Sequence, residues 1–346
     1  MGNRKVKNVL VTGGAGFIGS HTCVALAEAG YQPVVVDNFA NSQSDVLDRI
    51  AQIIGTAIPV HQVDCTDETG MRNILDRYED WQGVIHFAAY KAVGESVAHP
   101  LKYYRNNIGS LLTLLQLMND YPLHHLVFSS SCTVYGEPDH LPVTEKSPVR
   151  PAESPYGYTK QVGEQIITDQ QQVSPAMRSV LLRYFNPIGA HPSGKIGELP
   201  LGKPENLVPY VVQTAAGWRD QLTIFGRDYP TEDGTAIRDY IHVMDLAEAH
   251  VKALDWLHQQ EAQETPGIFN IGTGRGHSVK EVVDTFEDAT GIKVPHQFGS
   301  RRPGDVSSIY ADATLAQREL NWSASRTLGE ALHDAWMWQQ TLKPPA

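Results

Sequence analysis

A glycine-rich turn between an apolar strand and an apolar helix constrains the fold of this chain more than any other segment. Residues 8–20 read NVLVTGGAGFIGS and place Gly13, Gly16 and Gly19 at intervals of three. The apolar run before the turn predicts a buried strand at residues 8–12, and the run after it predicts a helix over residues 17–30. A strand followed at once by a helix is typical of a β-α-β unit, which builds a parallel sheet.

Further apolar runs continue this alternation through the first half of the chain. They predict a buried helix at 111–120 and strands at 33–37, 58–64, 83–89, 125–131 and 179–186. The strands are rich in β-branched residues on both faces, as in sheets covered by helices on two sides. The pattern indicates an α/β fold with a doubly wound parallel sheet of the Rossmann type.

The composition and periodicity of the sequence change after Asn186. Residues 187–207 are rich in Gly and Pro without a clear period, which is typical of a functional loop or a domain connection. Short mixed elements follow, including helical patterns at 279–291 and 328–340. We therefore expect a first domain at residues 1–186 and a smaller, mixed α/β domain at residues 187–346.

Composition and charge narrow the class of protein. The chain has 41% apolar and 19% charged residues, as ordinary globular proteins do, and its net charge of -11 argues against a nucleic-acid or membrane partner. No apolar run approaches the 18 or so residues of a membrane span. The three cysteines are widely separated without a CxxC pair, which favours reduced thiols. We expect a soluble, cytoplasmic protein.

The glycine turn has a composition suited to a dinucleotide. Glycines let the backbone approach a pyrophosphate, and the helix that follows directs its first N–H groups at the anion. Asp37 ends the second predicted strand, 18 residues after Gly19, where a carboxylate binds an adenosine ribose and repels a 2′-phosphate. The sequence therefore predicts NAD rather than NADP, with a purely structural glycine turn as the alternative. Asp64, which ends the third strand, is either an adenine contact or a turn residue.

The segment SPYGYTK places two tyrosines before Lys160. Pro155 suits the first turn of a helix, in which Tyr156 and Lys160 share a face while Tyr158 does not. A neighbouring ammonium and a nicotinamide cation would lower the tyrosine pKa from its usual value near 10. Ser131 ends a strand at the edge where such sheets bind ligands. The alternatives are a capping serine and a Tyr–Lys pair on a solvent-exposed helix face.

The glycine turn, the serine and the YxxxK motif together resemble the extended short-chain dehydrogenase/reductase superfamily and, within it, the UDP-glucose 4-epimerases. Further matches lie in both halves: HFAAYKAVGESV, YYRNN, SSSCTVYGEP, RYFNPIGAHPSG, FGRDYPTEDGTAIRDYIHVMDLA and RRPGDV. The resemblance implies a Rossmann domain that holds NAD tightly and a smaller domain for a nucleotide sugar. It also implies that some late segments return to the first domain, and that the protein is a homodimer.

The resemblance assigns site residues by matched position. The implied catalytic group is Ser131, Tyr156 and Lys160. The implied cofactor site consists of Gly13, Gly16, Phe17, Ile18, Gly19, Asp37, Asn38, Asp64, Cys65, Phe87, Ala88, Ala89, Lys91, Asn106, Tyr156, Lys160 and Phe185. The implied substrate site consists of Ser131, Tyr156, Asn186, Asn206, Leu207, Thr223, Ile224, Phe225, Arg238, Arg302, Asp305 and Ile309. Arg238 and Arg302 would hold a diphosphate, although each by itself is equally a solvated surface charge.

The implied reaction is the interconversion of UDP-glucose and UDP-galactose through a 4-keto intermediate, which is an isomerisation that belongs to galactose metabolism. Tyr156 would take the proton of the sugar 4-hydroxyl, with Ser131 relaying or orienting it. NAD is the one cofactor implied, the UDP-sugar is the one small-molecule partner, and no metal is expected.

Other functions remain open to different degrees. A sugar-nucleotide 4,6-dehydratase needs an acid/base pair after the serine, whereas CTV follows Ser131 here. An epimerase acting on UDP-N-acetylhexosamines or UDP-uronates stays open, because Ile309 occupies the position where a large tyrosine limits acetamido sugars and a small residue admits them. An NAD-binding regulator without turnover would typically lack the combination of Ser, Tyr and Lys found here.

Overall fold

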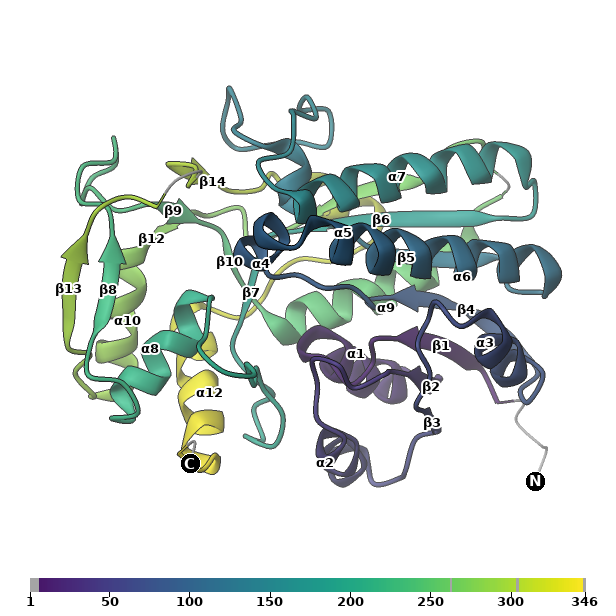
Figure 1. Ribbon diagram of the computed structural model, residues 1–346, viewed down its shortest axis with the longest axis horizontal. Coiled ribbons are helices and arrows are strands. Elements are labelled where there is room, and N and C mark those ends of the chain that lie inside the picture. Colours follow the sequence, from purple (N-terminus) through teal and green to yellow (C-terminus); the bar gives the residue numbers. More distant parts are fainter. Residues whose placement is uncertain (1–5, 262, 303–304, 345–346) are drawn as a thin grey trace.

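The computed structural model describes residues 6–261, 263–302 and 305–344 and contains one large sheet. Its seven strands lie in the order β11-β6-β5-β4-β1-β2-β3, and every neighbouring pair is parallel (Figure 1). The predicted doubly wound α/β fold is therefore confirmed. The strands are β1 (Asn8–Thr12), β2 (Gln32–Val36), β3 (Val60–His61), β4 (Trp81–His86), β5 (His125–Ser129), β6 (Arg178–Tyr184) and β11 (Gly267–Ile271).

Successive residues of each strand enter two separate hydrophobic cores. In β1, Val9 and Val11 belong to one core, and Leu10 belongs to the other. The first core includes residues of α1 (Phe17–Glu28), α2 (Asp45–Ile54), α9 (Val243–Gln259) and α11 (Thr314–Glu319). The second includes residues of α3 (Glu68–Leu75), α6 (Gly109–Asp120) and α7 (Pro155–Val173). Helices thus cover both faces of the sheet.

Two strands end earlier than predicted at their C-terminal ends, where the predicted site residues lie. The strands expected at 83–89 and 125–131 end at His86 and Ser129. Residues 87–92 and 130–131 are irregular, and the next elements are the helix α4 (Val93–Ala98) after β4 and the short helical turn η2 (Cys132–Tyr135) after β5. The strand expected at 58–64 is reduced to Val60–His61 at the sheet edge, where it has a single neighbour. A chain at an edge lacks the second ladder of hydrogen bonds that extends central strands.

The later part of the chain adds small sheets and helices on the left of Figure 1. β7 (Asn186–Ile188) pairs with β10 (Tyr240–His242), and β8 (Leu222–Phe225) pairs with β13 (His296–Gly299). β9 (Ile237–Arg238) lies between β12 (His277–Ser278) and β14 (Ser308–Ile309). Three helices share a core with β7, β8 and β10: α8 (Leu207–Ala215), α10 (Val279–Thr290) and α12 (Leu328–Thr341).

Two elements that follow residue 186 in the sequence belong to the large sheet and its covering helices. β11 pairs with β6, and α9 packs against α1. A domain boundary at residue 186 stays a prediction. Within the described residues, no helix combines the length and the apolar character that a membrane crossing requires.

Candidate active site

The glycine turn has the shape that a bound pyrophosphate requires. Gly13 adopts a φ of 71°, and a Cβ there would lie 2.8 Å from the backbone nitrogen of Ala88. A Cβ on Gly19 would lie 2.3 Å from the carbonyl oxygen of Gly13, so only glycine lets α1 approach the turn. Gly16 caps α1, and the nearest atom to a Cβ there is the same carbonyl, at 3.2 Å. The turn therefore fits a dinucleotide phosphate at the helix N-terminus.

Asp37 is tied to the glycine turn itself. Its Oδ2 accepts a hydrogen bond from the backbone N–H of Ala15 at 3.0 Å. Its Oδ1 accepts from the Phe39 N–H at 2.8 Å and from the Ser42 hydroxyl at 3.0 Å. A carboxylate has about four acceptor sites, so three of them are used and one is left for a ribose hydroxyl. The sequence predicted the ribose role of Asp37 and missed its role in ordering the turn.

Asp64 is a turn residue that also holds Asn38. Its Oδ1 accepts from the Thr66 N–H at 2.9 Å and the Thr66 hydroxyl at 2.7 Å, and its Oδ2 accepts from Asn38 Nδ2 at 2.8 Å. Burial acts to raise the pKa of Asp64, but these hydrogen bonds hold it below its usual range. The turn alternative is thus observed, and the adenine contact stays a prediction. The adjacent Cys65 is a buried thiol whose pKa burial raises.

The other predicted cofactor residues lie at the starts of helices or just after strands. Phe17 and Ile18 begin α1, and Phe87, Ala88 and Ala89 follow β4. The Phe87 ring packs with its centroid 4.7 Å from that of His250. Asn106 lies in the helical turn Tyr104–Ile108, and Phe185 lies between β6 and β7.

The two tyrosines of SPYGYTK have different environments, as the helical register predicted. α7 begins at Pro155, and its N-cap, Ser154, accepts a hydrogen bond from the Gly157 N–H at 3.2 Å. Tyr156 and Lys160 are 7% and 5% exposed. Tyr158 is 50% exposed and packs edge-on against Tyr104. Tyr156 and Lys160 therefore form the inward pair, and Tyr158 lies outside it.

Lys160 is directed at the end of β5. Its Nζ donates to the carbonyl oxygen of Ser129 at 2.6 Å and lies 5.9 Å from the centre of the Tyr156 ring. Burial lowers the pKa of Lys160 to about 8, and Glu164 opposes that shift. The ammonium form therefore dominates below about pH 8 and is lost above it.

The predicted lowering of the Tyr156 pKa depends on a nicotinamide cation as well as on Lys160, and it stays a prediction. Burial raises this pKa well above its usual value, and a hydrogen bond with Ser131 only partly opposes the rise. Ser131 also accepts from the Thr133 N–H at 3.2 Å, so the capping alternative for this serine is observed as well. The predicted lowering therefore requires a positive charge brought in with a ligand in addition to the Lys160 ammonium.

The predicted substrate residues form contacts across the later part of the chain. Arg238 pairs with Asp305 at 3.0 Å, and Arg302 lies 4.2 Å from the centre of the Phe225 ring. Ile309 is buried, and its backbone pairs with that of Arg238. Each guanidinium thus has a partner of its own, and the joint diphosphate contact of Arg238 and Arg302 stays a prediction. Thr223, Ile224 and Phe225 lie in β8, and Asn186 begins β7.

Glu198 connects a predicted cofactor residue with a predicted substrate residue, and the sequence reasoning missed it. Its Oε1 accepts from Lys91 at 3.3 Å and from Asn206 Nδ2 at 2.7 Å, where Asn206 is the N-cap of α8 and Leu207 its first residue. The Glu198 carbonyl accepts from the Trp338 indole at 3.0 Å. The contacts with Lys91 and Trp338 join segments more than a hundred residues apart, so no local pattern signals them.

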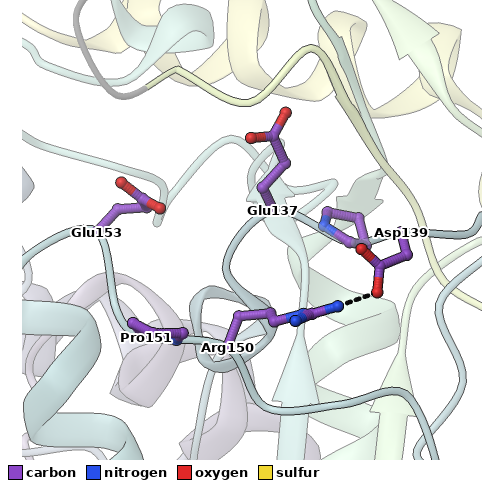
Figure 2. Close-up of a pocket in the computed structure, with 6 residues that line it drawn as sticks. Glu137, Asp139, Arg150, Pro151 and Glu153 are labelled. Carbon is purple, nitrogen blue, oxygen red and sulfur yellow. Dashed lines mark hydrogen bonds and ion pairs between the residues drawn. The ribbon is translucent and has the colours of Figure 1, made fainter.

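A separate hollow of about 460 Å³ contains none of the predicted site residues (Figure 2). Figure 2 shows Arg150 directed at Asp139, with which it forms an ion pair, and Glu137 and Glu153 on the opposite side. Carboxylates predominate among its lining side chains: Glu137, Pro138, Asp139, Arg150, Pro151 and Glu153. Because no predicted cofactor or catalytic residue lines this hollow, it is not the candidate active site.

Comparison with known proteins places the chain in a family. A model of the NAD dependent epimerase/dehydratase family matches residues 9–272. UDP-glucose 4-epimerase of Bacillus subtilis is 50% identical over 333 residues, which cover 96% of this chain and 97% of that protein. UDP-glucose 4-epimerase of Mus musculus is 47% identical over 341 residues, with 97% of each chain covered.

Solved structures agree with this placement. UDP-glucose 4-epimerase from Stenotrophomonas maltophila, with bound NAD and formylated UDP-arabinopyranose, has a TM-score of 0.93 at 48% identity and covers 97% of this chain and 98% of its own. The enzyme from Bifidobacterium longum, in complex with NAD+ and UDP, has a TM-score of 0.92 at 45% identity with the same coverage. This chain therefore belongs to the NAD dependent epimerase/dehydratase family, in which it resembles the UDP-glucose 4-epimerases.

Proposed function

We propose that this protein interconverts UDP-glucose and UDP-galactose as an isomerase of galactose metabolism, with NAD held tightly. The observation that carries the proposal is the burial of Tyr156 and Lys160 side by side at the end of β5, with Ser131 next to the phenol. The names of the relatives support the same substrates. Burial excludes water from the reacting groups, which strengthens each charge interaction there.

The glycine turn and Asp37 would hold NAD, which supplies a hydride acceptor and donor when it is bound. Lys160 would contact the cofactor ribose and keep a positive charge near the phenol of Tyr156. Tyr156 would accept the proton of the sugar 4-hydroxyl, and Ser131 would orient that proton. The reaction would have no net oxidation, because the phenol would return the proton and the hydride would return to the sugar from bound NAD.

Arg238 and Arg302 would hold the diphosphate while the sugar turns over. Arg238 already pairs with Asp305, so a diphosphate competes with that carboxylate for one guanidinium. A bidentate contact between arginine and phosphate is stronger than an exposed ion pair. Anchoring at the UDP end leaves either face of the sugar ring free to meet Tyr156.

A direct test separates an enzyme from a regulator. The pure protein is denatured and the released NAD is measured, while the native protein is assayed for conversion of UDP-galactose to UDP-glucose. We expect about one NAD per chain, because the glycine turn is preformed, and turnover without added cofactor. Bound NAD without turnover of any UDP-sugar would favour the non-catalytic alternative.

The range of sugars is tested at Ile309. Its side chain is smaller than a tyrosine and lies next to Arg238 on the neighbouring strand, which favours some activity on UDP-N-acetylglucosamine. We expect Ile309→Tyr to lower kcat/KM for that sugar about tenfold or more relative to UDP-glucose, because the larger ring fills the space of the acetamido group. Parallel assays with UDP-glucose, UDP-N-acetylglucosamine and UDP-glucuronate measure the ratio.

Ile309→Leu is the matched control, since it conserves volume and should leave the ratio unchanged. Equal losses on all three sugars in the tyrosine variant would mean that Ile309 supports the fold and does not select the sugar.

The proposal includes a homodimer in the cytoplasm. Four helices, α4, α5 (Pro100–Tyr103), α6 and α7, each expose an apolar side chain, which supports pairing of two copies. These side chains are Val97, Leu101, Leu112 and Tyr158. The three buried cysteines are free thiols, as in a reducing compartment. Sedimentation analysis tests the dimer.

A further inference from the structure

Glu164 is a buried carboxylate next to Tyr156 and Lys160. The proposed reaction does not use it. Tyr156, Lys160 and Glu164 lie four residues apart along α7 and therefore form one stripe on the inward face of the helix. Glu164 is 8% exposed. A buried charge requires partners, and the partners of Glu164 indicate what it does.

The first partner is Ser130, whose hydroxyl donates to Glu164 Oε1 at 2.5 Å. Ser130 is the middle residue of the segment 129–131, and each of its two neighbours interacts with a proposed catalytic side chain. The carbonyl of Ser129 accepts from Lys160 Nζ at 2.6 Å, and the Ser131 side chain acts to lower the pKa of the Tyr156 phenol. One carboxylate therefore fixes the centre of the segment that meets both catalytic side chains.

The second partner is Arg183 of β6, which lies beside α7 (Figure 1). Its Nε and Nη2 donate to the two oxygens of Glu164 at 2.9 and 2.6 Å. Its Nη1 donates to the hydroxyl of Tyr135 at 3.2 Å, and that hydroxyl donates to Asn270 Oδ1 at 2.6 Å. The pair is thus anchored to the turn after β5 and to β11. A buried ion pair adds little net stability over an apolar pair, so stability alone is a weak reason for it.

The charge of Glu164 matters for Lys160. Glu164 of α7 and His86 of β4 interact with Lys160 itself. The titratable or charged side chains that face its neighbours Tyr156 and Glu164 are Tyr184 and Arg183 of β6, Cys132 and Tyr135 of η2, and Tyr103 of α5. Burial lowers the pKa of His86 to about 3, so this ring is neutral. Among these groups Glu164 alone carries a carboxyl group. Its charge raises the pKa of Lys160 against the effect of burial.

We propose that Glu164, held in place by Arg183, is a positioning residue that orders the serine segment and places a carboxylate next to Lys160 on the inward face of α7. The inference rests on the catalytic roles proposed above for Tyr156, Lys160 and Ser131. It adds a carboxylate to the site that contacts neither the substrate nor the cofactor and acts through its two neighbours.

Glu164→Gln tests the proposal through the pH profile. The amide keeps the shape of the side chain but loses the charge that favours the Lys160 ammonium. The ammonium is present below its pKa, so a lower pKa moves the alkaline limb of kcat to lower pH, by about one unit or more. At the pH optimum we expect kcat to fall about 10- to 100-fold through the displaced serines, with KM for UDP-galactose changed less than about twofold.

Ser130→Ala separates the hydrogen bond from the charge. This variant keeps the ion pair between Glu164 and Arg183, so it tests the positioning effect even if Glu164→Gln fails to fold. We expect a lower kcat and an alkaline limb at the wild-type pH. A kcat equal to wild type in Ser130→Ala would overturn the positioning role.

Glu145→Gln is the matched control. Glu145 is a partly buried carboxylate that accepts from the Asn270 N–H at 2.8 Å, on the far side of the same polar chain. We expect it to leave the pH profile unchanged. A folded Glu164→Gln with the wild-type profile, or the same shift in Glu145→Gln, would overturn the proposal. Tyr156→Phe separates the proposed function from this inference. Full turnover in Tyr156→Phe would refute the proposed function. Loss of turnover in Tyr156→Phe together with wild-type kcat and pH profile in Glu164→Gln would refute only this inference.

Discussion

Tyr156→Phe is expected to lower kcat by about 10²- to 10⁴-fold, which is the usual contribution of a positioned acid/base. Phenylalanine keeps the ring, which is 7% exposed in the wild type, and removes only the hydroxyl. UDP should bind with a Kd within about twofold of wild type, because the diphosphate residues Arg238 and Arg302 lie elsewhere in the site. Steady-state kinetics with UDP-galactose and calorimetric titration with UDP measure the two effects.

Tyr158→Phe is the matched control on the same helix. Tyr158 is 50% exposed and its ring contacts Tyr104, so the loss of its hydroxyl should leave kcat unchanged and the fold intact. Near-normal turnover in Tyr156→Phe would refute the role of the phenol. Equal losses in both variants would mean that the chemistry does not distinguish the buried tyrosine from the exposed one.

The parts of the site that follow local rules could be predicted from the sequence. The four-residue spacing of Tyr156 and Lys160 fixes a shared helix face, and the structure confirms that Tyr158 lies outside it. The spacing of Gly13, Gly16 and Gly19 likewise fixes a strand, a turn and a helix. In each case the relevant atoms lie within one turn of a helix or one loop, so the periodicity of the backbone decides the geometry.

The parts that depend on distant segments could not be predicted. Glu164 was within reach, since it continues the stripe of Lys160 by four residues, but its partner Arg183 comes from the next strand along the chain. Glu198 meets Lys91 across 107 residues. The pKa of Tyr156 depends on burial as well as on its neighbours, and burial is a property of the whole fold.

Gly19→Ala is expected to disrupt the cofactor site and the fold together. A Cβ on Gly19 would lie 2.3 Å from the carbonyl oxygen of Gly13 and 2.8 Å from the Cα of Gly14. Both contacts are with backbone, so α1 itself must move away from the turn. Overpacking of this kind costs about 1–3 kcal/mol, which lowers Tm by several degrees. The first N–H groups of the helix move with it, so we expect NAD affinity to fall about tenfold or more.

Gly109→Ala provides the control, because Gly109 begins α6 and the nearest atom to a Cβ there is Thr66 Cγ2 at 3.5 Å, an ordinary contact. Alanine favours helix over glycine by up to about 1 kcal/mol, so this variant should keep its NAD and unfold at an equal or higher temperature. Thermal denaturation and the NAD content of the purified proteins measure both effects. A Gly19→Ala protein with wild-type Tm and full NAD would show that the helix adjusts without cost, and that the close approach at Gly19 is not what shapes the phosphate site.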